Sequence, residues 1–364
     1  MIEWLMAASW SPYLVGAGIG VLIWTVFLLS DRPLGCSTAY AKTAGMIEWA
    51  ISRQKTESMP YYRKITPTID WQWMLVVGTM MGAALSAYLS GGWSISVVPP
   101  LFKESFGTDE LLRLAVALPG GILMGLGARW ADGCTSGHGI SGTLQLSLAS
   151  WIAVICFFAA GIIVAGLIYG FSFLCGGMSM AFDWMRSEGR AQKALGLLSG
   201  LVFGFLLQKG GLTEYDVILG QLLLTDFTVV KVLLSAILVG MLGVFVMRWL
   251  GLVRLQIQPG SIGSTVLGGI LFGVGFAILG YCPGTAAAAF GAGSIDALVG
   301  MVGIVIGAGI FARLYPALDR RILNWGAFPA DTLPELIGLK PGIVAAVMAA
   351  LIIGLLYLLA TMGL

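Results

Sequence analysis

The sequence predicts an all-α, polytopic membrane protein, and its composition, its apolar segments and an internal repeat all indicate this fold class. Hydrophobic residues make up 58% of the 364-residue chain and charged residues only 10%, and the mean hydropathy is +0.93. One soluble core cannot bury that much apolar surface, so lipid has to solvate part of it. Nine apolar segments, most near the ~20 residues that cross a hydrocarbon core, follow along the chain: 12–30, 71–90, 111–131, 147–172, 194–208, 227–250, 263–281, 295–314 and 342–362.

The first apolar segment is expected to remain as a transmembrane helix. The residues before it, Met1-Ile2-Glu3-Trp4, lack the basic region of a cleavable signal peptide. The polar segments 51–70, 176–193 and 317–341 are expected to be loops, and each is too short for a separate soluble domain. We therefore expect one integral membrane domain over residues 1–364.

Basic residues between the first two segments suggest an orientation. Arg53, Lys55, Arg63 and Lys64 lie in this loop, which places it in the cytoplasm by the positive-inside rule. Nine spans then put the N-terminus outside and the C-terminus inside. The net charge of +2 is small and spread over several loops, so no nucleic-acid partner is expected.

Internal repetition is the strongest organisational signal. A shift of 148 residues superimposes the glycines and the cysteine of one segment on those of another, and a shift of 178 gives a weaker match that pairs Phe27 with Phe205. The chain is thus predicted to form two pseudo-symmetric halves, 10–172 and 193–315, with an additional C-terminal helix at 342–362. The 148-residue shift matches Gly120, Gly121, Gly125, Gly127 and Cys134 to Gly268, Gly269, Gly273, Gly275 and Cys282.

Three cysteines occur in similar settings, each after an apolar segment and before small residues: Cys36, Cys134 and Cys282. In lipid every backbone N–H and C=O needs a partner, so such breaks are tolerated only where they face protein or a polar cavity. Repeated broken helices that converge on a pseudo-symmetry axis are a common way to build a transport site. We expect four short broken or re-entrant helices and a pathway lined by thiols.

Helix-start residues follow each break. Ser37 and Thr38, then Thr135 and Ser136, are candidate N-caps; Pro283 suits a first helical turn, and Thr213 to Asp216 has the spacing of a capping box. Helix N-termini that point inward favour an anion, by ~0.3–1 kcal/mol each when exposed. Neutral thiols are soft, polarisable contacts that suit a reduced sulfur anion better than sulfate or a carboxylate.

A pathway for an anion also needs a cation. Lys209, near the fourth break, is the preferred candidate, because Arg129 and Arg32 could extend to the membrane interface. His138, the only histidine, lies four residues after Cys134, on the same face if the segment is helical, and is a candidate for the pathway. Cys156 and Cys175 fall outside the repeat pattern and are expected to be structural.

Two motifs and the order of the predicted helices carry a resemblance to a known family. The motifs are the string Gly133-Cys134-Thr135-Ser136-Gly137-His138-Gly139 and Cys282-Pro283-Gly284, and the predicted order is a span followed by a short helix, repeated four times. Over about residues 10–315 these features resemble the YeeE/YedE family of bacterial thiosulfate (sulfur compound) transporters. The resemblance implies an hourglass-like inner-membrane permease in which thiosulfate passes Cys36, Cys134 and Cys282, with a soluble cytoplasmic sulfur-carrier protein as a plausible partner. By motif position, further pathway residues are Ser37, Thr38, Thr135, Ser136, Gly137, Tyr281, Gly284 and Thr285.

Other interpretations stay open at this point. Sulfide, persulfide or a selenium species such as selenite could be the cargo, and the protein could be a channel instead of a carrier. A membrane thiol redox protein is less favoured, because the chain has no Cys-x-x-Cys pair and no nucleotide motif. One histidine and scattered thiols lack the spacing of metal ligands, so we expect no metal, no cofactor and no enzymatic activity.

Overall fold

The predicted all-α membrane fold is confirmed by the computed structural model, which describes residues 6–30, 34–170, 190–253, 255, 257 and 260–363. Within these ranges nine helical segments are long and apolar enough to cross a membrane. They correspond one to one to the nine predicted segments, including the short stretch at 194–208. They are α2 (Pro12–Ser30), α6 (Trp71–Leu89), α8 (Glu110–Trp130), α9 (Leu148–Tyr169), α10 (Arg190–Lys209), α12 (Thr228–Trp249), the broken segment Ile262–Ala292, α15 (Ile295–Leu318, continued to Leu323) and α17 (Pro341–Thr361).

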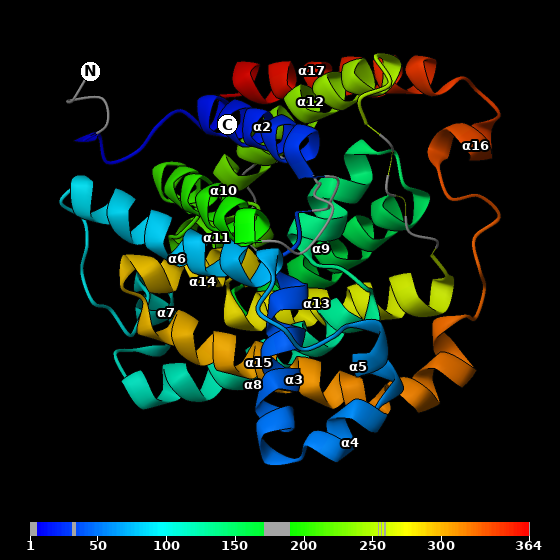
Figure 1. Ribbon diagram of the computed structural model, residues 1–364. Helices are drawn as coiled ribbons and strands as arrows, with labels where there is room; N and C mark the ends of the chain where they lie inside the picture. Colours follow the sequence, from blue (N-terminus) through cyan, green and yellow to red (C-terminus); the bar gives the residue numbers. More distant parts are fainter. Residues whose placement is uncertain are drawn as a thin grey trace.

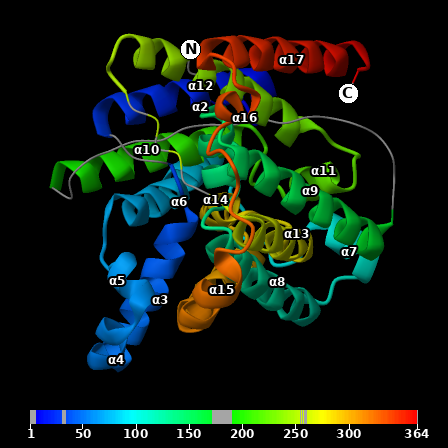
Figure 2. The same cartoon turned by 90° about the vertical axis from the view of Figure 1, so that its right-hand side faces the viewer.

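Shorter helices connect these spans. The helix α3 (Ser37–Ile51) runs out of the bundle and carries α4 (Arg53–Ser58) and α5 (Pro60–Lys64), away from α12 and α17 at the opposite edge (Figure 1, Figure 2). The broken segment consists of η2 (Ile262–Val266), α13 (Leu267–Leu279) and α14 (Pro283–Ala292). The remaining short helices are α7 (Pro100–Phe106), the π-helix η1 (Thr135–Gly142), α11 (Tyr215–Leu222), the π-helix η3 (Asp319–Leu323) and α16 (Leu333–Ile337).

The repeated glycines let α8 and α13 pack backbone against backbone. A Cβ at Gly127 would lie 2.3 Å from the Phe272 nitrogen, and a Cβ at Gly275 would lie 2.3 Å from the Met124 nitrogen. The two contacts correspond to each other under the 148-residue repeat, because Gly127 corresponds to Gly275 and Met124 to Phe272. Such reciprocal contacts indicate a pseudo-two-fold axis between the two helices. Small residues that permit close approach are the usual basis of helix packing in membranes.

Two further helix pairs run parallel and in close contact. On α10, glycines at 196, 200 and 204 face Trp71, Leu75 and Thr79 of α6 in the same order, so both helices begin at the same end of the bundle. On α2, Gly16 and Gly20 face Val232 and Val239 of α12 in the same way. Consequently the start of α12 lies at the opposite end of the bundle from the end of α2.

The helix starts agree only in part with the predicted caps. Pro283 occupies the first turn of α14 as predicted, behind Cys282 as the N-cap. The other capping predictions are wrong: Cys36, Cys134 and Glu214 are the N-cap residues of α3, η1 and α11, and none makes a side-chain cap hydrogen bond. The predicted capping groups of the first two breaks bond elsewhere or stay free, as described below, and Asp216 instead accepts from the Leu101 amide at 3.0 Å.

Replacing Gly125 by Ala tests the glycine packing. The new Cβ would lie 2.2 Å from the Ile304 carbonyl oxygen of α15, so the helices have to separate, at a cost of roughly 1–3 kcal/mol. We expect the melting temperature of the detergent-solubilised protein, followed by size-exclusion chromatography after heating, to fall. In α17, Gly354→Ala is the matched control, since nothing lies within 4 Å of its Cβ position. An equal effect of both substitutions would contradict the close packing.

Candidate functional site

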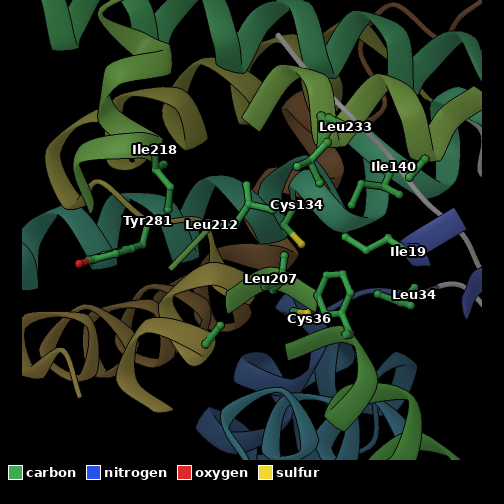
Figure 3. Close-up of a cluster of buried hydrophobic side chains, with 14 of the residues drawn as sticks. Ile19, Leu34, Cys36, Cys134, Ile140, Leu207, Leu212, Ile218, Leu233 and Tyr281 are labelled. Carbon is green, nitrogen blue, oxygen red and sulfur yellow. The ribbon is translucent and has the colours of Figure 1, made fainter. Parts of the chain in front are cut away.

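Three thiols from three separate helix breaks meet at one place in the bundle. The Ser136 hydroxyl accepts from the Cys36 amide at 3.2 Å and lies 3.1 Å from the Cys134 sulfur. A Cβ at Gly284, two residues after Cys282, would lie 3.3 Å from the Cys36 sulfur. Figure 3 shows Cys36 and Cys134 among the apolar side chains of Ile19 and Leu207. We refer to Cys36, Cys134 and Cys282 together as the thiol cluster.

Local structure at the third break orients Cys282. Its sulfur accepts from the Thr285 amide at 3.4 Å and from the Thr285 hydroxyl at 3.3 Å, and its own amide donates to that hydroxyl at 2.8 Å. The pair thus forms a capping box in which sulfur takes the place of oxygen. Cys36 and Cys134 are fully buried, whereas Cys282 is partly exposed.

Two hydroxyl groups that the sequence did not single out tie the breaks together. The Tyr40 hydroxyl on α3 donates to the Pro283 carbonyl at 2.7 Å. The Ser141 hydroxyl lies within 3.1 Å of the Leu34 carbonyl and within 3.0 Å of the Ser136 carbonyl. The Leu34 carbonyl lies in the break after α2, outside any helix, so Ser141 supplies it with a partner.

A recess of about 280 Å³ lies beside the breaks at Cys36 and Cys134, at the end of the bundle where α2 and α8 end and α6 and α9 begin. We call it the polar recess. Several predicted pathway residues line it: Ser37, Thr38, Arg129, Gly137 and His138, together with Lys64, Asp132 and Gln145. Among the described lining residues the formal charges are two positive and one negative, so the recess favours an anion.

Arg129 is the central charge of the polar recess. It is 3% exposed and donates to the Tyr61 hydroxyl at 2.7 Å, to Asp132 at 2.7 Å, and more weakly to Ser37 and Thr38, each at 3.4 Å. Ser37 and Thr38 therefore face the arginine instead of capping α3. Burial raises the pKa of the Tyr61 phenol above its usual range, despite the neighbouring guanidinium, so Tyr61 contributes no charge.

A second cavity, of about 60 Å³, touches the cluster from the other side. We call it the apolar cavity. Its walls come from the end of α10, from α11 and from the start of α12, which lie opposite the mouth of the polar recess because α10 is parallel to α6 and α12 to α2. The predicted residues Thr135, Ser136, Cys282, Gly284 and Thr285 line it with Gln221 and apolar side chains, and no described lining residue is charged.

Two polar atoms at the apolar cavity have no hydrogen-bond partner among the described residues. They are the Thr135 hydroxyl and the Gln221 side-chain oxygen, and both are buried. A buried polar atom without a partner costs about 1–3 kcal/mol. Such a cost is removed when a polar ligand or water occupies the cavity.

His138 faces the polar recess but is held by the protein. One ring nitrogen, Nε2, lies 2.7 Å from the Ala131 carbonyl and the other, Nδ1, lies 3.0 Å from the Ser150 hydroxyl. Because a carbonyl can only accept, Nε2 carries the proton. Gly137 borders open space, with nothing within 4 Å of its Cβ position.

Two predicted site residues lie away from the thiols. The Lys209 ammonium donates to the Ala7 carbonyl at 2.7 Å and to the Ser90 hydroxyl at 2.6 Å, and it lines neither the polar recess nor the apolar cavity. Tyr281 points away from Cys134 in Figure 3, and its ring packs edge-on against Tyr215 at 5.6 Å. Of these two predicted cations, Arg129 and not Lys209 therefore lines the polar recess.

The remaining cysteines and arginine considered in the sequence are Cys156, Cys175 and Arg32. Cys156 lies within α9 against Gly269, and it lines neither cavity. Arg32 and Cys175 lie outside the described residues. Among the described residues, no group of three His, Cys, Asp or Glu side chains could hold a metal ion.

Within the described part of the chain, nine apolar helical segments with broken helices at the centre of the bundle are the architecture of a multi-pass membrane protein. A family model described as "Sulphur transport" matches residues 1–164 and 215–362, and the chain belongs to that family.

Two relatives carry the name thiosulfate transporter TsuA. The one from Spirochaeta thermophila is 33% identical over 101 residues, which cover 28% of each chain. The one from Escherichia coli is 26% identical over 154 residues, which cover 42% of this chain and 37% of the relative. A probable transporter of Xylella fastidiosa is 47% identical over 71 residues, 18% of this chain and 53% of the relative. The matches thus span about a third of the length of the thiosulfate transporters.

Burial predicts an order of reactivity for the thiols. In variants that retain one of the five cysteines, methyl methanethiosulfonate is expected to modify Cys282 fastest and Cys36 and Cys134 roughly tenfold more slowly, since reactivity follows access. Mass spectrometry of the intact protein over time measures the three rates. If Cys36 reacted as fast as Cys282, the closed arrangement of the thiol cluster would be wrong.

Proposed function

We propose that this transporter takes up a reduced sulfur anion, thiosulfate above all, across the bacterial inner membrane. The cargo passes from the polar recess through the thiol cluster to the apolar cavity, or in the reverse direction. The single observation that carries the proposal is the convergence of three thiols from three helix breaks between two cavities at opposite ends of the bundle. The names of the relatives supply the cargo.

The chemistry of the cluster suits a soft anion. An S–H group donates weakly and is polarisable, so it matches a terminal sulfur atom better than a hard oxyanion. Around the thiols, the Ser136 and Thr285 hydroxyls and the first turn of α14 add donors for the charged end of the cargo. A neutral cluster also keeps binding weak enough for release, which conduction requires.

The described conformation is closed. Cys36 and Cys134 are at most 1% exposed, so cargo passes only if α3, η1 or α14 shifts. A Cβ at Gly284 would meet only side-chain atoms, the Cys36 sulfur at 3.3 Å and the Phe203 ring at 3.8 Å among them, and side chains can move. This favours gated passage over a permanently open channel.

Removal of single thiols tests the pathway. We expect Cys134→Ala and Cys282→Ala each to abolish growth on thiosulfate as sole sulfur source and to reduce uptake of labelled thiosulfate to background, with normal amounts of protein in the membrane. Because Cys156 lies outside the pathway, Cys156→Ala should leave uptake unchanged. Normal uptake by either pathway variant would rule out passage along the cysteines.

A methyl group at the constriction tests its width. In Gly284→Ala the new Cβ would lie 3.3 Å from the Cys36 sulfur, so passage should slow severalfold, although alanine favours a helix by ~1 kcal/mol over glycine. Gly309→Ala in α15 is the control for the change in helix propensity, because its new Cβ would lie 3.6 Å from the Ala44 Cβ, an ordinary contact. Initial uptake rates and melting temperatures of both variants separate transport from folding. Unchanged uptake by Gly284→Ala would move the constriction elsewhere.

Uptake into proteoliposomes ranks the cargo. Labelled thiosulfate should accumulate inside vesicles that contain the purified protein, sulfide and selenite should compete if they share the thiols, and sulfate should not. Chemical conversion of the sulfur compound without transport would instead favour a thiol redox protein.

Two further predictions belong to the same proposal. The N-terminus lies outside and the C-terminus inside the membrane, and sulfur is delivered to a soluble cytoplasmic carrier protein.

A further inference from the structure

Asp132 adopts a backbone conformation that is unusual for its residue type. Its φ of +60° lies in the left-handed region, where α8 stops and the chain turns toward Cys134. Under the 148-residue repeat its counterpart is Gly280, which has a φ of +81° and ends α13 in the same way. Glycine is the unstrained choice at such a helix end. The first copy of the repeat therefore carries an aspartate at a position that prefers glycine.

The side chain explains what this aspartate contributes. Its carboxylate accepts from Arg129 at 2.7 Å, and it is 46% exposed while the arginine side chain is 2% exposed. The other partners of Arg129 are the neutral hydroxyls of Tyr61, Ser37 and Thr38. Asp132 is thus the one charged partner of Arg129 among the described residues. The counterpart of Arg129 in the second copy is Ala277, so this ion pair exists on one side of the thiol cluster only.

We propose that Asp132 is a resident counter-ion that the anionic cargo displaces from Arg129 when it enters the polar recess. This inference rests on the proposed function. A buried guanidinium without a negative partner is costly, and Asp132 supplies that partner while the recess is empty. It is the exposed and movable member of the pair, on a strained turn, so it can yield the guanidinium to an anion in the recess.

Displacement has a consequence for affinity and specificity. Cargo binds only by competing with Asp132, so the recess holds an anion more weakly than Arg129 alone would. The carboxylate also repels any anion, and it repels one of higher charge more strongly. Asp132 is accordingly a specificity-determining residue that lowers affinity and keeps the arginine from retaining its cargo.

The test compares Asp132→Asn with Asp132→Gly. Asn keeps an acceptor oxygen and tolerates positive φ, but it removes the charge; Gly removes both the charge and the strain. We expect both variants to lower the KM for thiosulfate roughly threefold to tenfold, in line with the loss of one partly exposed charged hydrogen bond, and to lower the maximal uptake rate as release slows. A purely structural role would instead change the melting temperature alone and leave both kinetic parameters unchanged, which would overturn the proposal.

Arg129→Lys supplies the coupling test. Lysine keeps the positive charge but loses the forked geometry that reaches Asp132 and Tyr61 together. In this background Asp132→Asn should change KM much less than in the natural sequence; an undiminished effect would show that Asp132 acts independently of Arg129. Uptake by Cys134→Ala, measured alongside, separates the two proposals. If Cys134→Ala abolishes uptake while the Asp132 variants keep unaltered kinetics, the counter-ion role of Asp132 is refuted and the proposed passage along the thiols is not.

Discussion

The structure depends on one constraint, that a helix broken inside a bilayer leaves backbone groups which only the protein can satisfy. The three breaks that carry thiols have such partners. Arg113, fully buried, donates to the Leu279 carbonyl at 2.7 Å at the end of α13, the His138 Nε2–H donates to the Ala131 carbonyl at 2.7 Å after α8, and Ser141 donates to the Leu34 carbonyl after α2. Ser141 belongs to η1, which follows the second break, so its hydrogen bond holds the first two breaks together. Close glycine packing holds α8 and α13, the helices before the second and third breaks, against each other.

The sequence predicted most of the fold, because membrane spans have a strong one-dimensional signal. Nine apolar segments and the glycine repeat at 148 residues were sufficient for the number of spans, and the reciprocal contacts of Gly127 and Gly275 give that repeat its physical reason. Helix caps were predicted less well. Ser37 and Thr38 are good capping residues by type, but the guanidinium of Arg129 competes for their hydroxyls. That competitor is distant in sequence and could not be seen from local spacing.

In the candidate site too, features that depend on local sequence were predictable, whereas contacts between residues distant in sequence were not. The breaks at Cys36, Cys134 and Cys282 are local motifs, and the structure brings them together. The sequence favours Lys209 over Arg129 because an arginine could extend to the membrane interface, yet hydrogen bonds to Ala7 and Ser90 hold Lys209 elsewhere. Asp132 was missed, although the repeat contains its signal: a non-glycine residue opposite Gly280. Tyr61 and Gln221 lie outside every motif, and only the packing of the chain reveals them.

The two cavities differ in charge, and this difference constrains how an anion can cross. The polar recess holds a buried arginine and its exposed counter-ion Asp132, whereas the described lining of the apolar cavity is uncharged and includes the unpartnered oxygens of Thr135 and Gln221. Inward-facing helix ends and thiols replace part of the water that the anion leaves, but they carry no full charge. The free energy of the anion therefore rises as it leaves Arg129 and reaches the thiol cluster. In the proposed displacement, return of Asp132 to the guanidinium offsets part of that rise, because the buried charge regains its partner as the cargo departs.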